Sequence, residues 1–121
     1  MHDDFRNSNA LKHIHSYCKE IERTLAEINH SREKFDKSST HRNALALCVL
    51  QIGELVGILD DGFKGKHSQI PWRDIKQMRN IVAHRYGSFD FDILWEVVTD
   101  DILKLKDFCE VNEAKNKNIK L

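Results

Sequence analysis

The sequence predicts an all-α protein of a single domain, an antiparallel four-helix bundle of the up-and-down kind, covering residues 1–121. Apolar residues recur at helical spacing over four long stretches, which is the primary signal for amphipathic helices. No stretch shows the strict alternation of apolar and polar residues that is typical of a half-buried strand. One proline and five glycines interrupt the helices at few places. Four such helices are expected to pack as a bundle.

The first two helices are expected at about Asn9 to His30 and His41 to Asp60. The polar residues 31–40 separate them, and residues 61–66, which contain two glycines, predict a loop after the second helix. The apolar stripe of the first helix is Leu11, Ile14, Cys18, Ile21, Leu25 and Ile28, and that of the second is Leu45, Cys48, Val49, Ile52, Leu55, Val56 and Leu59.

The third helix is expected to begin at Pro71, a favoured first-turn residue, and to end at Gly87. Asp74 then lies in the early turn, at the positive end of the helix dipole. Asp90 is a candidate cap for the fourth helix. The chain is polar from about residue 112, so we expect a frayed tail there and a short flexible N-terminus. The apolar face of the fourth helix is Ile93, Leu94, Val97, Val98, Ile102, Leu105 and Phe108.

The second helix carries further features on its other faces. Ala46, Gly53 and Gly57 form a stripe of small residues that permits the close approach of another helix, while Leu47 and Ile58 lie on yet another side. A helix that is apolar on more than one face usually contacts more than one neighbour, which favours self-association. The alternative is a helix wrapped by the other three helices of its own chain.

The composition limits the partners and the compartment. Nineteen basic and nineteen acidic residues give no net charge, so any contact with RNA must come from a local patch. Three cysteines without C-x-x-C spacing lie in apolar-periodic segments, which favours buried thiols in a reducing compartment. We find no signal peptide and no apolar run long enough to span a membrane. The cytoplasm is therefore the expected location.

Arg79 and His84, near the end of the third helix, are the candidate catalytic residues. A permanent cation and an imidazole that titrates near neutrality are the pair needed to cleave a phosphodiester without a metal. Five residues apart on a helix, the two side chains diverge by about 140° and converge poorly on one phosphate. A second copy of the helix across a two-fold axis would bring both types into one cleft, so we expect a dimer with a shared site.

The chemistry that these residues permit is ribose-assisted cleavage of single-stranded or loop RNA. His84 would act as general base on a 2′-hydroxyl, Arg79 would stabilise the charge on the phosphate, and Asn80 would orient the histidine or the phosphate. The products would be a 2′,3′-cyclic phosphate and a 5′-hydroxyl. Three further cations of this helix are candidate RNA contacts: Arg73, Lys76 and Arg85. No metal and no cofactor is expected, since Glu27-x-x-His30 matches only half of a di-iron motif.

Arg79-x4-His84-x-Tyr86 resembles the R-x4-H-x-Y signature of HEPN domains, and specifically of the HepT-like toxins. The likeness runs from about Leu11 to Phe108 and includes three further segments, which are Gln51-Ile52-Gly53-Glu54, Ile70-Pro71-Trp72, and Asp92 with Trp95. The resemblance implies a HEPN-like helical homodimer that acts as a metal-independent endoribonuclease. It also implies the toxin of a type VII toxin–antitoxin system, whose minimal nucleotidyltransferase antitoxin transfers AMP to Tyr86 and so blocks the cleft.

Other interpretations remain open at this stage. The protein could be a non-catalytic HEPN module that binds a nucleotide or docks a nucleotidyltransferase, or a purely structural helical dimer. Arg79 and His84 would then belong to a solvated polar face, and Tyr86 would be a half-buried core residue. Glu54 could brace Arg79 or be a plain surface glutamate. Gly87-Ser88 with Asp90 and Asp92 is faintly similar to a nucleotidyltransferase site, but that chemistry needs strands that this chain lacks.

Overall fold

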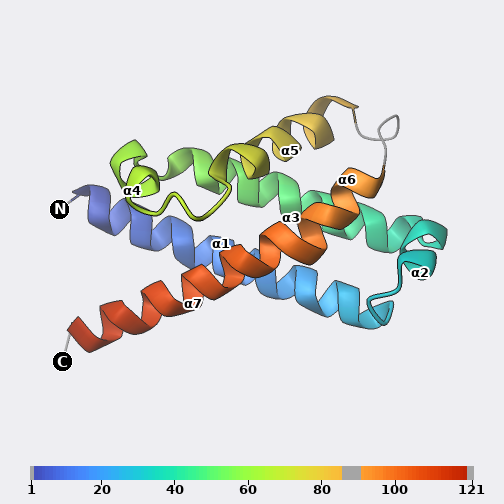
Figure 1. Cartoon of the computed structure of the whole chain (residues 1–121), viewed down its shortest axis with the longest axis horizontal. Coiled ribbons are helices and arrows are strands. Elements are labelled where there is room, and N and C mark those ends of the chain that lie inside the picture. The colour runs from blue at the N-terminus through green and yellow to red at the C-terminus, as the bar shows by residue number, and fades with distance from the viewer. Residues whose placement is uncertain (1, 86–90, 120–121) are drawn as a thin grey trace.

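The structure is a computed structural model that describes residues 2–85 and 91–119, with side chains described for 5–85 and 91–115. Over these ranges the protein is all-helical and forms the expected antiparallel bundle (Figure 1). The long helices are α1 (His2–Glu27), α3 (Ser39–Ile58), α5 (Trp72–Arg85) and α7 (Ile102–Ile119). Helix α3 lies between α1 and α5, and α7 packs on α1.

The fourth predicted helix is a continuous helical element that consists of three segments. Helix α6 (Phe91–Glu96) leads through a π-helical turn, η1 (Val97–Asp101), into α7, and Figure 1 shows the three as a continuous element. The Thr99 hydroxyl donates to the carbonyl of Trp95 at 2.7 Å, so this carbonyl is satisfied where the helix widens. Helix α7 continues to Ile119, beyond the point where the polar composition begins.

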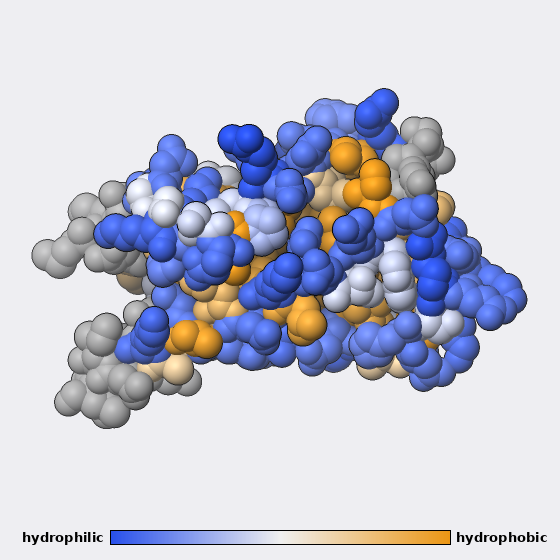
Figure 2. All heavy atoms as spheres, in the orientation of Figure 1, coloured by the Kyte–Doolittle hydropathy of each residue, from blue (hydrophilic) through white to orange (hydrophobic). Residues whose placement is uncertain are grey.

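The core contains most of each apolar stripe that the sequence predicts, but Ile93 of the predicted fourth-helix face is exposed, so its placement in the core was wrong. Each long helix contributes fully buried residues, which are Ile14 of α1, Leu45 and Ile52 of α3, Ile75 of α5 and Leu105 of α7. Apolar residues show only in small patches on the face drawn in Figure 2, among charged and polar ones. The larger exposed apolar side chains are Phe5, Leu47, Ile58, Ile93, Leu103 and Val111.

Two short helices lie in the connections, so the prediction of a loop at 61–66 was wrong, and the polar stretch 31–40 contains a helix that was not expected. Helix α2 (Arg32–Lys37) is capped by the Ser31 hydroxyl, and α4 (Asp61–Lys66) by the Asp60 carboxylate, which accepts from the Phe63 N–H at 3.3 Å. Each short helix is held by one aromatic anchor. The Phe35 ring of α2 lies 5.0 Å from that of Trp95, and the Phe63 ring of α4 lies 6.0 Å from that of Phe108.

Helix α1 ends at Glu27, three residues before the expected boundary at His30. Asn29 and His30 have left-handed φ values of 56° and 55°, and the His30 N–H donates to the carbonyl of Leu25 at 2.8 Å. This turn satisfies a terminal carbonyl and ends the helix without a glycine. Gly87 and Asp90, the expected end of the third helix and cap of the fourth, lie outside the described residues.

The crossing of α3 and α5 places the functional residues. A Cβ added at Gly53 would lie 2.2 Å from the Cβ of Arg79, so only glycine allows this close approach. A Cβ added at Gly57, one turn later, would meet no described atom within 4 Å. Ala46 and Gly53 are buried, so at Gly53 the stripe of small residues serves a contact within the chain.

The cysteines Cys18, Cys48 and Cys109 are free thiols buried in the bundle, as the sequence predicts. Burial raises the pKa of Cys48 and of Cys109 to about 12, and it raises the pKa of Cys18 as well. These thiols therefore remain protonated and unreactive at neutral pH. In the part of the chain that the structure describes, no helix is long and apolar enough to cross a membrane.

Candidate active site

The Arg79 guanidinium is held by one residue from α3 and one from its own helix. Its Nε donates to Oε1 of Glu54, and its Nη2 forms an ion pair with the same oxygen. Its Nη1 donates to Oδ1 of Asn80 at 3.0 Å. The Glu54 and Arg79 side chains are 51% and 30% exposed, so the pair is open to solvent on one side. The structure thus favours the interpretation in which Glu54 braces Arg79 over the one in which it is a plain surface glutamate.

These contacts leave part of the guanidinium available. An arginine side chain has five N–H donors, and Glu54 and Asn80 accept from two of them, on Nε and Nη1. Nη2 forms an ion pair with Glu54. Its two N–H groups and one on Nη1 make no hydrogen bond to a described residue, so the two terminal nitrogens can together bind two oxygens of a phosphate. Since Oδ1 of Asn80 accepts from Arg79, the Asn80 amide keeps its N–H groups as donors for another partner.

His84 lies in the last turn of α5 and is exposed. No described residue hydrogen-bonds to its imidazole, so the ring is accessible to a substrate. Its backbone is about 7.5 Å further along the helix axis than that of Arg79 and is rotated by about 140°. Arg79 turns toward α3 while His84 faces solvent, so one chain does not bring the two groups to one point.

An open groove of about 400 Å³ runs beside Arg79, between α3 and α5. Gly53 and Gly57 form a floor without side chains, and Ile58 gives it an apolar end. Lys76 and Arg79 supply positive charge to its walls, and Glu54 supplies the one negative charge among the lining residues. The full lining is Gly53, Glu54, Gly57, Ile58, Lys76, Arg79 and Asn80. Such a groove suits a phosphate-bearing ligand of about nucleotide size.

The remaining predicted RNA contacts lie on the same helix. Arg73, Lys76 and Arg85 are exposed on α5, and Arg85 is in its last turn beside His84. Asp74 is the one acidic residue of α5 and lies in its first turn. The local excess of positive charge that the sequence predicts is therefore on the surface, on an otherwise neutral chain.

Residues 14–111 match the family described as Ribonuclease HepT-like. The chain belongs to this HepT-like ribonuclease family. It is 32% identical over 96 residues to a protein of Caldanaerobacter subterraneus, a match that covers 79% of this chain and 84% of the relative. It is 30% identical over 78 residues to a protein of Methanocaldococcus jannaschii, covering 64% and 72% respectively. Both relatives are named "Putative RNase".

A third relative is the "Probable ribonuclease HepT" of Thermococcus cleftensis, which is 40% identical over 55 residues. That match covers 46% of this chain and 50% of the relative. No solved structure matches the chain.

The other residues that carry the HepT-like resemblance are structural or fall outside the described residues. Asp92 pairs with Arg32 at 2.6 Å, and the Trp95 ring packs on Phe35, so both hold α6 against α2. The Trp72 indole donates to the carbonyl of His67 at 3.0 Å and fixes the entry to α5. Tyr86, the predicted modification site, lies outside the described residues.

The sequence did not show which contact Gly53 makes at the site. A glycine inside a long helix lowers the stability of the helix by about 0.5–1 kcal/mol relative to alanine, so its presence already indicated a close contact at this position. The structure shows that this contact is with the Arg79 stem.

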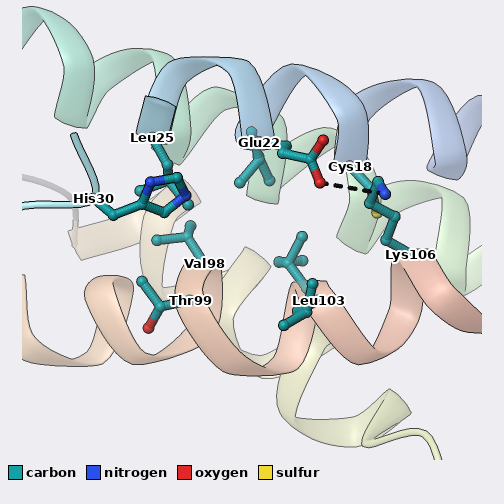
Figure 3. A pocket seen from close by; sticks show the side chains of 10 residues that line it. Cys18, Glu22, Leu25, His30, Val98, Thr99, Leu103 and Lys106 are labelled. Atoms are coloured by element: carbon teal, nitrogen blue, oxygen red, sulfur yellow. Dashed lines mark ion pairs between the residues drawn. The ribbon is translucent and has the colours of Figure 1, made fainter. Parts of the chain in front are cut away.

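A second hollow, of about 110 Å³, lies between α1 and α7. Figure 3 shows its two polar ends, with His30 at one and the ion pair between Lys106 and Glu22 at the other. Apolar side chains such as Val98 and Leu103 lie between them. The polar groups are therefore kept apart, and the hollow is a weaker candidate for phosphodiester chemistry than the groove beside Arg79.

Proposed function

We propose that the protein is a metal-independent endoribonuclease, the toxin of a HepT-like toxin–antitoxin pair. The observation that carries the proposal is the presentation of Arg79, which Glu54 and Asn80 hold in place while N–H groups of its two terminal nitrogens make no hydrogen bond to a described residue. An accessible His84 on the same helix supplies the group that can take a proton. The names of the relatives, two of them "Putative RNase" and one "Probable ribonuclease HepT", support the same reaction class.

In the proposed reaction, neutral His84 takes the proton from the 2′-hydroxyl of the substrate ribose. The 2′-oxygen attacks the adjacent phosphorus, and the bond from phosphorus to the 5′-oxygen of the next nucleotide breaks. The N–H groups of the Arg79 terminal nitrogens stabilise the charge that develops on the phosphate oxygens. The leaving 5′-oxygen takes a proton from water, and the His84 imidazolium returns its proton to solvent, which gives a 2′,3′-cyclic phosphate and a 5′-hydroxyl end.

We propose that the active form is a two-fold homodimer with a shared cleft. Arg79 and His84 of one chain point in different directions, so Arg79 of one protomer and His84 of its partner would meet at one phosphate. Exposed Leu47 and Ile58 offer apolar surface on α3 next to the groove. Two copies of the cationic face of α5 would bind the RNA backbone through phosphates, with Arg73, Lys76 and Arg85 as contacts.

We also propose that a minimal nucleotidyltransferase antitoxin inhibits the enzyme by transferring AMP to Tyr86. This tyrosine follows His84 by two residues in the sequence, so an AMP group on it would add bulk and negative charge close to the proposed base. Phosphate on the protein would repel the RNA backbone. Intact mass measured before and after incubation with the antitoxin and ATP tests this step, and Tyr86→Phe should abolish the added mass.

The cleavage itself is tested with purified protein and single-stranded RNA in excess EDTA, followed by analysis of the fragment ends. We expect cyclic-phosphate ends from the parent and none from His84→Ala, with unchanged unfolding because the side chain is exposed. His13→Ala, at an exposed histidine of α1, is the matched control and should cleave like the parent. An unmodified parent that does not cleave would contradict the proposal and favour a non-catalytic module that binds a nucleotide or docks a nucleotidyltransferase.

A further inference from the structure

We propose that Glu54 is a positioning residue of the active site, which fixes the direction of the Arg79 guanidinium. The inference rests on the proposed ribonuclease function and names a residue on a different helix from the signature. Glu54 itself would not touch the reacting atoms. It would act through Arg79, by the paired contacts of its Oε1 with Nε and Nη2.

The stem of Arg79 is already restricted before the carboxylate acts. Gly53 lies so close to the Arg79 Cβ and Cγ that a Cβ at residue 53 would overlap both, at 2.2 and 2.7 Å. Gly53 and Glu54 are consecutive, so one turn of α3 holds both ends of the arginine side chain. An arginine on an open helix surface samples many rotamers. Here the backbone of α3 limits the stem, and the next residue limits the head.

The direction of the contact also decides which donors remain. Glu54 accepts the Nε–H and pairs with Nη2, and Asn80 accepts one N–H from Nη1. Among the described residues, nothing accepts the other N–H groups of the two terminal nitrogens. Without Glu54 the guanidinium could rotate and present its donors elsewhere. Misplacement by about 1 Å of a group that stabilises the transition state can lower a rate about 100-fold.

The Glu54 carboxylate should support catalysis through Arg79 but oppose the binding of RNA. Glu54 is half-exposed in the groove and adds negative charge next to the site where a phosphate would bind. Removing it should therefore leave the affinity for RNA unchanged or raise it, because the local charge becomes more positive. A positioning role thus predicts a lower kcat without a higher KM. A plain surface glutamate predicts no change in kcat.

The test compares Glu54→Ala and Glu54→Gln with the parent, and uses Glu33→Ala as the matched control. Glu33 is an exposed glutamate of α2 that pairs with Lys37 at 2.9 Å. Its removal changes the net charge by the same amount as removal of Glu54, but at a position outside the groove. We expect a kcat about 10- to 100-fold lower for Glu54→Ala. Glu54→Gln keeps an acceptor for the Arg79 Nε–H and should recover part of the rate. Glu33→Ala should cleave like the parent.

A second readout does not depend on RNA cleavage. The Arg79 Nε–H should give a slowly exchanging side-chain resonance in the parent, lose this protection in Glu54→Ala and regain part of it in Glu54→Gln. Unchanged exchange of the Arg79 Nε–H in Glu54→Ala, or an unchanged kcat of this variant, would overturn the proposal. So would a Glu54→Ala variant whose main change is a raised KM. A parent that shows the protected resonance but cleaves no RNA would contradict the ribonuclease function while leaving the brace in place.

Discussion

A guanidinium group that stabilises a phosphate must keep two donors available and be held in one direction, and Arg79 meets both conditions. Glu54 and Asn80 accept from two of its N–H groups, Glu54 also pairs with Nη2, and Gly53 leaves room for its stem. The signature spacing predicts Arg79 and His84 as a pair. The stripe of small residues predicts a close helix approach at Gly53, but the contact with Arg79 joins residues far apart in the sequence, so no local pattern could predict its partner. Glu54 could be named only as one of two interpretations.

A second carboxylate, Glu110 on α7, gives a residue-scale prediction for stability. It accepts from His15 at 3.0 Å and pairs with Lys106 at 3.2 Å. These partners lower the pKa of Glu110, with the hydrogen bond to His15 as the largest cause. A carboxyl whose pKa is lower in the folded state stabilises the fold above its unfolded pKa, and this contribution is lost as the pH falls through the folded value.

We therefore expect Glu110→Gln to lower the Tm at neutral pH, by an amount that shrinks as the pH falls below the ordinary range of a glutamate, about 4.3. Thermal unfolding of parent and variant across pH 2–7 measures this difference. Glu33→Gln, whose pair with Lys37 joins side chains 76% and 75% exposed, should change the Tm little at any pH. A Tm difference for Glu110→Gln that is the same at all pH values would contradict the assignment.

At the scale of elements, the long helices could be predicted because each has a stripe of many apolar residues at helical spacing. The short helices α2 and α4 could not, because each has one main apolar anchor, Phe35 or Phe63, which gives no period. Their partners, Trp95 and Phe108, come from the other end of the chain. The early end of α1 depends on the left-handed backbone at Asn29 and His30. Both residue types adopt this conformation more often than most, but they also occur within helices, so the sequence does not fix the boundary.

The crossing of α3 and α5 gives a prediction from two glycines one turn apart. Gly53→Ala should lower the free energy of unfolding by about 1–3 kcal/mol, because its Cβ would overlap the Arg79 stem. Gly57→Ala should instead raise it by about 0.5–1 kcal/mol, because the helix gains a better former and the Cβ meets no described atom within 4 Å. Urea unfolding of both variants measures the difference. Equal stability of the two variants would show that α3 and α5 do not cross in this way.

At the scale of the whole molecule, the chain has no net charge, and the cations that we propose as RNA contacts lie on one helix, α5. The bundle presents Arg79 at a groove formed with α3 and leaves His84 exposed near the helix end. In the proposed function, a single chain holds Arg79 and His84 in different directions, and a second copy completes the site. The shared site is the central claim.

Mixed dimers of two inactive variants test this claim most directly. Arg79→Ala and His84→Ala, co-expressed with different tags, should each be inactive alone and together recover about a quarter of the parent's cleavage. Random pairing makes half of the dimers mixed, and each mixed dimer holds one intact site of two. Co-expression of Arg79→Ala with the double variant Arg79→Ala/His84→Ala should stay inactive. Mixed dimers of the two single variants that form but do not cleave would contradict a site shared between protomers.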